Sequence, residues 1–292
     1  MSEHEHDPDL SPEPGRLAGT SLSGLPAPNW GEPDLTIATD PDGAAREAAE
    51  RIAAALVAAV ELRGRADFCT TGGNTPIPIY RLLAQAPLVD AIPWQRVHFW
   101  WGDDRFVPRG HPESNVASLD DVLLGGAEGE PGSAPLPTAN IHPFPTDRAL
   151  GWNHDNKWCA ARYAEEMAVH LPLADGNWPV FDLILVGVGD DGHLLSVFPG
   201  SPALDSFDWT MGIPAPTHIG PHIPRVTINP RLLEAAPVLV VTWGASKADA
   251  LGHVFGETRD DRLWPVQRTR RPGSAWIVDE SAASKIPRER RA

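Results

Sequence analysis

Cysteine, long apolar runs and basic residues are all scarce in this sequence of 292 residues. Its two cysteines, Cys69 and Cys159, are too few for a disulfide framework or a structural zinc site, so we expect two buried thiols. No run of about eighteen apolar residues occurs, and the N-terminal segment lacks the basic-then-apolar order of a secretory signal. The sequence therefore predicts a cytoplasmic protein that has no membrane partner.

The charge balance disfavours a second class of partner. Asp and Glu number 39 against 24 Lys and Arg, which gives a formal net charge of −15. Such a field opposes adhesion to nucleic-acid phosphates and to anionic lipid surfaces, so we expect no nucleic-acid partner. A small anionic ligand can still bind where local donors and cations overcome the field.

Composition along the chain predicts one folded domain between two tails. Residues 1–32 are rich in Pro, Gly, Ser and acidic residues without a sustained apolar period, which is typical of a disordered acidic tail. Residues 33–284 hold the periodic apolar segments, and we expect them to form a single domain. Residues 285–292 follow the last such segment, and we expect a solvated basic tail there. Its cations are Lys285, Arg288, Arg290 and Arg291.

The apolar pattern of the domain alternates between helical and strand-like segments. Asp40 as a cap, Pro41 at the first helical position and a helical apolar period up to Gly64 predict an amphipathic helix. Strand-like runs that alternate with helical segments lie at 65–71, 96–101, 180–188, 238–243 and 275–278. This alternation predicts an α/β fold: a single-domain, mostly parallel, Rossmann-like sheet with helices on both faces. We expect residues 125–145 and 200–224 to be long surface loops.

Polar loops follow several of these strand-like runs. In a parallel sheet, ligands collect outside the carboxyl ends of the strands, where helix N-termini present free N–H groups. The loop 71–76 offers the amides of Gly72 and Gly73 and the side chains of Asn74 and Thr75, a pattern that suits a phosphate. An ordinary turn with a helix cap uses the same residue types, so both interpretations stay open.

Three cations lie on or beside other strand ends. Arg105 follows Asp103 and Asp104, so its guanidinium can fork onto a phosphate while a carboxylate orients it; a structural ion pair is the alternative. Lys247 is expected in the first turn of a helix, where it either meets an anion or is solvated. Arg225 opens a predicted strand, Val226 to Ile228, and is a weaker candidate.

The most apolar strand-like run, 180–188, leads into a glycine-rich loop that ends at His193. Asp191 lies two residues earlier, and a histidine beside a carboxylate at a strand end is typical of a general base. A surface histidine without a function is the alternative. His98 lies within an apolar run, and we expect it to be a core residue instead.

Several motifs occur together and in a fixed order. They are Thr71-Gly-Gly-Asn-Thr-Pro with Tyr80, Asp103-Asp-Arg105 with Ser114-Asn115, and the segment 181–193 followed by Ser196 and Phe198-Pro-Gly200. Arg225-Val-Thr-Ile, Gly244-Ala-Ser-Lys247 and Trp276-Ile-Val-Asp279 continue the series. Over about residues 35–284 these motifs resemble the 6-phosphogluconolactonase family, in its lactonase branch rather than among the related glucosamine-6-phosphate deaminases. The family usually has Ser or Thr at Asn74, Glu at Asp104 and Thr at Leu194.

The resemblance implies a hydrolase that opens 6-phospho-D-glucono-1,5-lactone to 6-phosphogluconate in the oxidative pentose phosphate pathway, without a metal or an organic cofactor. It implies that His193 activates water and that Asp191 orients the imidazole. The residues then expected to bind this sugar-phosphate lactone are Gly72, Gly73, Asn74, Thr75, Asp103, Arg105, Arg225 and Lys247. Two alternatives stay open: a glucosamine-6-phosphate isomerase or deaminase, and a non-enzymatic sugar-phosphate sensor. For the oligomeric state we expect a monomer or a weak homodimer.

Overall fold

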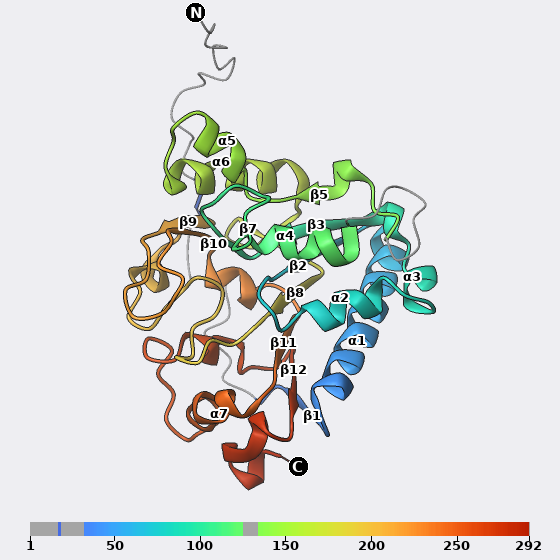
Figure 1. The fold of residues 1–292 in the computed structure, drawn as a ribbon, viewed down its shortest axis with the longest axis vertical. Helices are drawn as coiled ribbons and strands as arrows, with labels where there is room; N and C mark the ends of the chain where they lie inside the picture. The colour runs from blue at the N-terminus through green and yellow to red at the C-terminus, as the bar shows by residue number, and fades with distance from the viewer. Residues whose placement is uncertain (1–16, 19–31, 125–133, 292) are drawn as a thin grey trace, which may run out of the picture.

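A parallel sheet of seven strands forms the centre of the molecule (Figure 1). The structure is a computed structural model, and it describes residues 17–18, 32–124 and 134–291. The strands have the order β1-β12-β11-β8-β2-β3-β5, and every neighbouring pair is parallel. They are β1 (Asp34–Ala38), β2 (Ala66–Thr70), β3 (Val97–Trp101), β5 (Ile141–His142), β8 (Leu183–Val186), β11 (Val238–Thr242) and β12 (Ser274–Asp279). The predicted, mostly parallel α/β fold is therefore confirmed.

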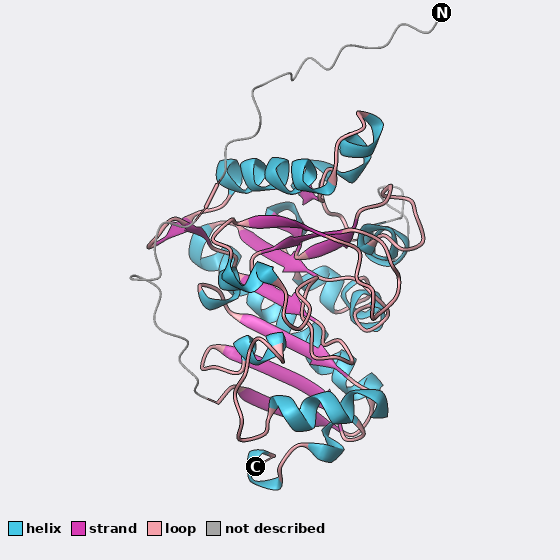
Figure 2. Ribbon diagram, turned by 90° about the vertical axis from the view of Figure 1, so that its left-hand side faces the viewer, coloured by secondary structure: helices cyan, strands magenta, loops and turns pink. Residues whose placement is uncertain are grey.

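Helices lie on both sides of this sheet (Figure 2). Helix α1 (Pro41–Arg63) packs across β12, β2, β11 and β8, and α2 and α3 pack against α1. Helix α6 lies near the β5 edge of this sheet and contacts β9 (Thr210–Ile213) and β10 (Arg225–Ile228) of a second sheet. The remaining α-helices are α2 (Ile77–Leu83), α3 (Leu88–Ala91), α4 (Asn115–Leu119), α5 (Thr146–Gly151), α6 (Asn156–His170) and α7 (Ala248–Val254). Short 3₁₀ turns cover Trp94–Arg96, Thr138–Asn140, Pro202–Asp205, Pro230–Glu234, Ala245–Lys247, Pro265–Thr269, Ala282–Lys285 and Arg288–Arg290, and a π-helical turn covers Asp120–Leu124.

Helix α1 forms where the sequence predicts it and for the predicted reasons. The Asp40 carboxylate accepts a hydrogen bond from the Gly43 N–H at 2.7 Å, and Pro41 follows at the first helical position. Gly64 ends the helix in the left-handed conformation, with a φ of 76°. The buried face is mostly alanine with Ile52 and Leu56, and such small side chains let the helix lie close to the sheet.

Two further sheets consist of short strands, and of these the sequence pattern indicated only the strand that Arg225 opens. An antiparallel sheet has the order β4-β10-β9, and a hairpin pairs β6 with β7. The strands are β4 (Asp103–Arg105), β6 (Leu173–Ala174), β7 (Trp178–Pro179), β9 (Thr210–Ile213) and β10 (Arg225–Ile228). The prediction of pure loops at 125–145 and 200–224 is wrong, because the first range contains β5 and the second contains β9. Strands of two to four residues are too short to show a period of their own.

The chain reverses its direction of travel across the sheet between β2 and β8. From β2 it continues outward to β3 and β5, and from β8 it continues the opposite way to β11 and β12. The loops after β2 and β8 therefore diverge and leave a crevice at the carboxyl edge of the sheet. In open α/β sheets this switch point is where ligands bind.

The C-terminal segment has contacts with the domain, while Lys285, Arg288 and Arg291 are exposed to solvent. Lys285 forms an ion pair with Asp249, and Arg290 forms one with Glu32. Arg291 donates hydrogen bonds to the carbonyl oxygens of Ser284 and Ile286. The expected acidic tail, 1–32, falls almost entirely outside the described residues. Within the described residues, no helix is long and apolar enough to cross a membrane. Both cysteines are buried free thiols, as predicted.

Candidate active site

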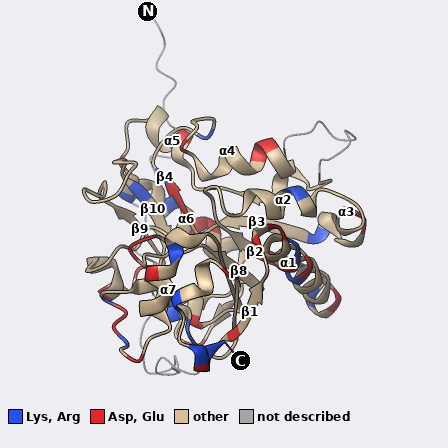
Figure 3. Cartoon of the chain, turned by 60° about the horizontal axis from the view of Figure 1, so that its bottom comes forward, with Lys and Arg blue, Asp and Glu red and all other residues tan. Residues whose placement is uncertain are grey.

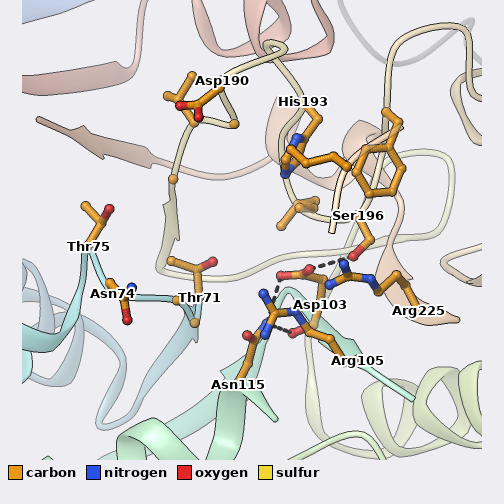
Figure 4. A pocket seen from close by; sticks show the side chains of 18 of the residues that line it. Thr71, Asn74, Thr75, Asp103, Arg105, Asn115, Asp190, His193, Ser196 and Arg225 are labelled. Atoms are coloured by element: carbon orange, nitrogen blue, oxygen red, sulfur yellow. Dashed lines mark hydrogen bonds between the residues drawn. The ribbon is translucent and has the colours of Figure 1, made fainter. Parts of the chain in front are cut away.

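A cavity of about 240 Å³ opens at the switch point between β2 and β8 (Figure 4). The loops after β2, β8 and β11 line it together with β4 and the first residue of β10. Every predicted binding residue lies on its wall: Gly72, Gly73, Asn74, Thr75, Asp103, Arg105, Arg225 and Lys247. His193 also lines the cavity, whereas Asp191 contacts the imidazole without lining the cavity itself. The structure thus brings the candidate base and the candidate anion-binding groups to one place.

The loop after β2 is held by packing on both sides. A Cβ at Gly72 would lie 2.1 Å from the side chain of Asn115, so only glycine fits against this buried amide. Gly73 has a φ of 85°, which also favours glycine. On the side of α2, the Tyr80 hydroxyl donates to the Thr71 carbonyl oxygen and lies 2.6 Å from the Thr70 hydroxyl. The loop amides are therefore held in place before any ligand arrives.

Two arginines face each other across the small antiparallel sheet. Arg105 on β4 is the direct partner of Arg225 on β10, and both line the cavity. Arg225 is 95% buried, and its Nε has no hydrogen-bond partner within the described part of the chain. Burial and the neighbouring Arg105 charge lower the pKa of Arg225. Like charges directly opposite each other destabilise a strand pair, so this arrangement favours an anion between the two guanidinium groups.

Acidic and basic residues lie close together here, and Figure 3 shows acidic residues at β4 and basic residues near β10. Arg105 also donates to the Glu113 carbonyl oxygen at 2.6 Å, which fixes its direction. Asp103 accepts a hydrogen bond from the Ser196 hydroxyl at 2.6 Å, and the Asn115 amide donates to the Asp103 carbonyl oxygen at 2.9 Å. The cation pair is thus mounted on a rigid hydrogen-bonded frame rather than on mobile side chains.

Asp104 points away from the cavity and is almost fully buried. Burial raises the pKa of its carboxyl to about 7, although the N–H groups of Asn115 and Arg105 and the hydroxyl of Ser114 favour the ionised form. Ser114 also caps α4 by accepting a hydrogen bond from the Val116 N–H. Asp104 therefore supports the frame of the site and does not face a ligand.

The imidazole of His193 is held by a carboxylate on one side and by an aromatic ring on the other. Its Nδ1 lies 2.5 Å from the Asp191 carboxylate, and the Phe198 ring lies 4.8 Å away between ring centres. His218 Nε2 lies 2.8 Å from the second oxygen of Asp191. Burial alone would raise the pKa of Asp191, but the hydrogen bonds from His193 and His218 hold it well below its usual range. Asp191 is thus a permanently ionised acceptor, which orients the His193 ring.

Lys247 also lines the cavity, from the turn that follows β11. Its Nζ donates to the Val188 carbonyl oxygen at 2.8 Å and forms an ion pair with Asp190 at 2.6 Å. It lies in a 3₁₀ turn, Ala245–Lys247, that runs directly into α7. An ammonium group has three donors, so one remains for a ligand in the cavity. Lys247 thus adds a third cation to the wall of the cavity that Arg105 and Arg225 line.

Sequence reasoning missed several residues of the site. The sequence gives Asn115, Ser196 and Phe198 only as parts of motifs and predicts no role in the site for them. His218 comes from the predicted loop 200–224, and nothing in the local sequence indicates its contact with Asp191. Leu195 lines the cavity with a φ of 53°, an uncommon backbone conformation for a leucine. Only the folded chain brings these residues together.

Known proteins resemble this chain over most of its length. The family model for glucosamine-6-phosphate isomerases/6-phosphogluconolactonase matches residues 39–278. The 6-phosphogluconolactonase of Synechocystis sp. is 35% identical, with 79% of this chain and 89% of the relative aligned. That of Streptomyces coelicolor is 32% identical, with 88% and 95% aligned. The solved 6-phosphogluconolactonase of Trypanosoma brucei has the same fold, with a TM-score of 0.74 over 88% of this chain and 99% of that chain at 24% identity. The chain therefore belongs to the glucosamine-6-phosphate isomerase/6-phosphogluconolactonase family.

Proposed function

We propose that this protein hydrolyses 6-phospho-D-glucono-1,5-lactone to 6-phosphogluconate. The observation that carries the proposal is the joint presence, in one cavity, of the His193–Asp191 pair and the facing Arg105 and Arg225 guanidinium groups. The first pair suits water activation, and the second suits a dianionic phosphate. The relatives of 30% identity or more that carry the name 6-phosphogluconolactonase support the same reaction.

His193 takes the central chemical role in this mechanism. Its Nδ1 is held by Asp191, so its Nε2 is the nitrogen that can accept a proton from water. The resulting hydroxide attacks the lactone carbonyl carbon, and the proton on His193 passes to the ring oxygen as the ring C–O bond breaks. A lactone is an activated ester, so this route draws on no covalent nucleophile and on no cofactor.

The phosphate group sets the position of the lactone. Arg105 and Arg225 neutralise it, while the amides of Gly72 and Gly73 and the side chains of Asn74 and Thr75 complete its hydrogen bonds. Lys247 provides a cation at the His193 end of the cavity, where its free donor meets the sugar. The energy of phosphate binding is thereby converted into alignment of the carbonyl with the activated water.

The test compares two substitutions in the purified enzyme. His193→Ala should lower kcat by about 10²- to 10⁴-fold with KM little changed, because only water activation is lost. Arg105→Ala should raise KM by about tenfold or more, because a charge-assisted contact to phosphate is lost. Acid release from freshly generated 6-phosphogluconolactone measures both, and unphosphorylated gluconolactone should be hydrolysed far more slowly.

Two matched variants serve as controls. His154→Ala removes a histidine that stacks on Trp158, and Arg109→Ala removes an arginine paired with Asp120, and neither side chain lines the cavity. Full turnover in His193→Ala would contradict the role of the base. Ammonia release from glucosamine 6-phosphate would instead favour the deaminase alternative, and sugar-phosphate binding without turnover would favour a sensor.

The remaining sequence predictions belong to the same proposal. Action in the oxidative pentose phosphate pathway goes with a cytoplasmic location, and cell fractionation tests it. A monomer or weak homodimer is the expected assembly, and light scattering over a range of protein concentrations measures it.

A further inference from the structure

A second cluster of titratable side chains lies outside the catalytic cavity, between the edge strand β5 and helix α6. It consists of His142, Glu166 and His170, with His98 of β3 behind His142. None of these four lines the catalytic cavity. The reaction proposed above therefore leaves the cluster unexplained.

The ligand atoms of His142, Glu166 and His170 face one another. Glu166 Oε1 lies 2.9 Å from His142 Nδ1 and 3.3 Å from His170 Nε2. All three ligand atoms lie within 4.8 Å of one another. Zinc binds imidazole nitrogen at about 2.0–2.1 Å and carboxylate oxygen at about 2.0–2.2 Å in tetrahedral sites, which places neighbouring ligand atoms about 3.3 Å apart. The cluster is thus close to the spacing of three ligands around one ion.

The fold holds each ligand in this position. Glu166 and His170 are four residues apart on α6, so they share one face of the helix. His142 is buried, and its ring stacks on Trp100 with 4.0 Å between ring centres. His142 Nε2 lies 2.9 Å from His98 Nδ1, which can accept its proton and leave the Nδ1 lone pair facing the other ligands. A ligating histidine whose second nitrogen has such a partner is the usual arrangement in metal sites.

We propose that His142, Glu166 and His170 bind one zinc ion or a similar late first-row divalent cation. Two imidazoles and one carboxylate suit such ions, whereas magnesium and calcium prefer oxygen ligands alone. Glu166 and His170 are 46% and 33% exposed, so the ion can enter from solvent and water can fill its fourth position. The ion would join β5 to the last turns of α6, and its role is to stabilise this edge of the sheet.

Titration calorimetry tests the site. The full-length, untagged protein is first treated with a chelator and is then titrated with zinc. The wild type should bind one zinc ion in a component that Glu166→Gln and His170→Gln each weaken by at least about tenfold. Zinc should also raise the Tm of the wild type but not of the two variants, and magnesium should do neither. Both substituted residues are partly exposed, so their loss leaves the core intact.

Two control variants match the changes in chemistry. Glu165→Gln removes a carboxylate from the next position of α6 that pairs with Arg162, and His154→Gln removes an imidazole that stacks on Trp158. Both should bind zinc as the wild type does. Absence of zinc binding in the wild type, or binding that survives both Glu166→Gln and His170→Gln, would overturn the proposal. Lactone hydrolysis is measured separately, so failure of one proposal leaves the other unaffected.

Discussion

At the scale of single residues, the catalytic loop is shaped by the absence of a side chain at Gly189. A Cβ at Gly189 would lie 2.0 Å from His193 Nδ1 and 2.7 Å from an oxygen of Asp191. The imidazole therefore lies in the space that any larger residue would occupy. Its hydrogen bond to Asp191 depends on this glycine as much as on the two polar residues.

Gly189→Ala should therefore displace the His193 ring and reduce kcat by at least about tenfold, since misplaced catalytic groups lose rate steeply. Steady-state kinetics with the phosphorylated lactone measures this loss. Gly110→Ala is the matched control, because a Cβ at Gly110 meets no atom within 4 Å and Gly110 does not line the cavity. Equal activity of the two variants would show that the ring does not need the observed position.

At the scale of elements, the three residues of β4 separate the cavity from the interior. Successive side chains of a strand point to opposite faces. Asp103 and Arg105 accordingly line the cavity, while Asp104 between them is buried. One short strand thus supplies a ligand-facing cation and a buried carboxyl that accepts hydrogen bonds from the start of α4.

Asp104 predicts a pH dependence of stability. Its pKa in the folded protein is raised to about 7, so between about pH 4 and pH 7 the folded state holds a proton that the unfolded state releases. This contribution to the free energy of unfolding is present at low pH and is lost as the pH rises to 7. Asp104→Asn should remove it.

Urea unfolding at pH 5 and pH 8 compares the two proteins. The wild type should lose more stability than Asp104→Asn between these values, because contributions from other groups are common to both. An equal loss in both proteins would mean that Asp104 ionises in the folded state as it does in an unfolded chain.

At the scale of the whole molecule, Glu32 ties the start of the described domain to its end. Its carboxylate accepts hydrogen bonds from Arg270 at 2.9 Å and from Arg259 at 3.2 Å, and it pairs with Arg290. Burial would raise the pKa of Glu32, but these guanidinium groups lower it. Arg270 is almost fully buried and also donates to the carbonyl oxygens of Val254 and Gly256. Segments that are far apart in the sequence are thereby joined at one point.

Glu32→Gln should lower the free energy of unfolding by roughly 1.5 kcal/mol or more. The neutral amide is a weaker acceptor than the carboxylate for the hydrogen bonds from Arg270 and Arg259, and Arg270 is buried. Denaturant unfolding measures this change. Glu61→Gln, which changes an exposed carboxylate on α1, should cost less than about 0.5 kcal/mol. Similar values for the two variants would show that the Glu32 contacts do not contribute to stability.

The sequence by itself determined the main elements and the position of the site. The period of α1, its cap at Asp40 and the long apolar strands are encoded in neighbouring residues, and burial of one face makes such patterns visible. Because these strands are parallel, their polar loops meet at one edge of the sheet, and this places His193 beside the loop of Gly72 and Gly73.

Only the tertiary structure decided how distant residues pair. Arg225 faces Arg105, Ser196 binds Asp103, and His218 reaches Asp191, although no local pattern links these positions. The short strands β5 and β9 form because β3 and β10 offer them hydrogen bonds, and not because of a pattern in their own residues. Such pairs depend on how the whole chain packs, and the free energy of that packing is shared among residues that no short stretch of sequence contains.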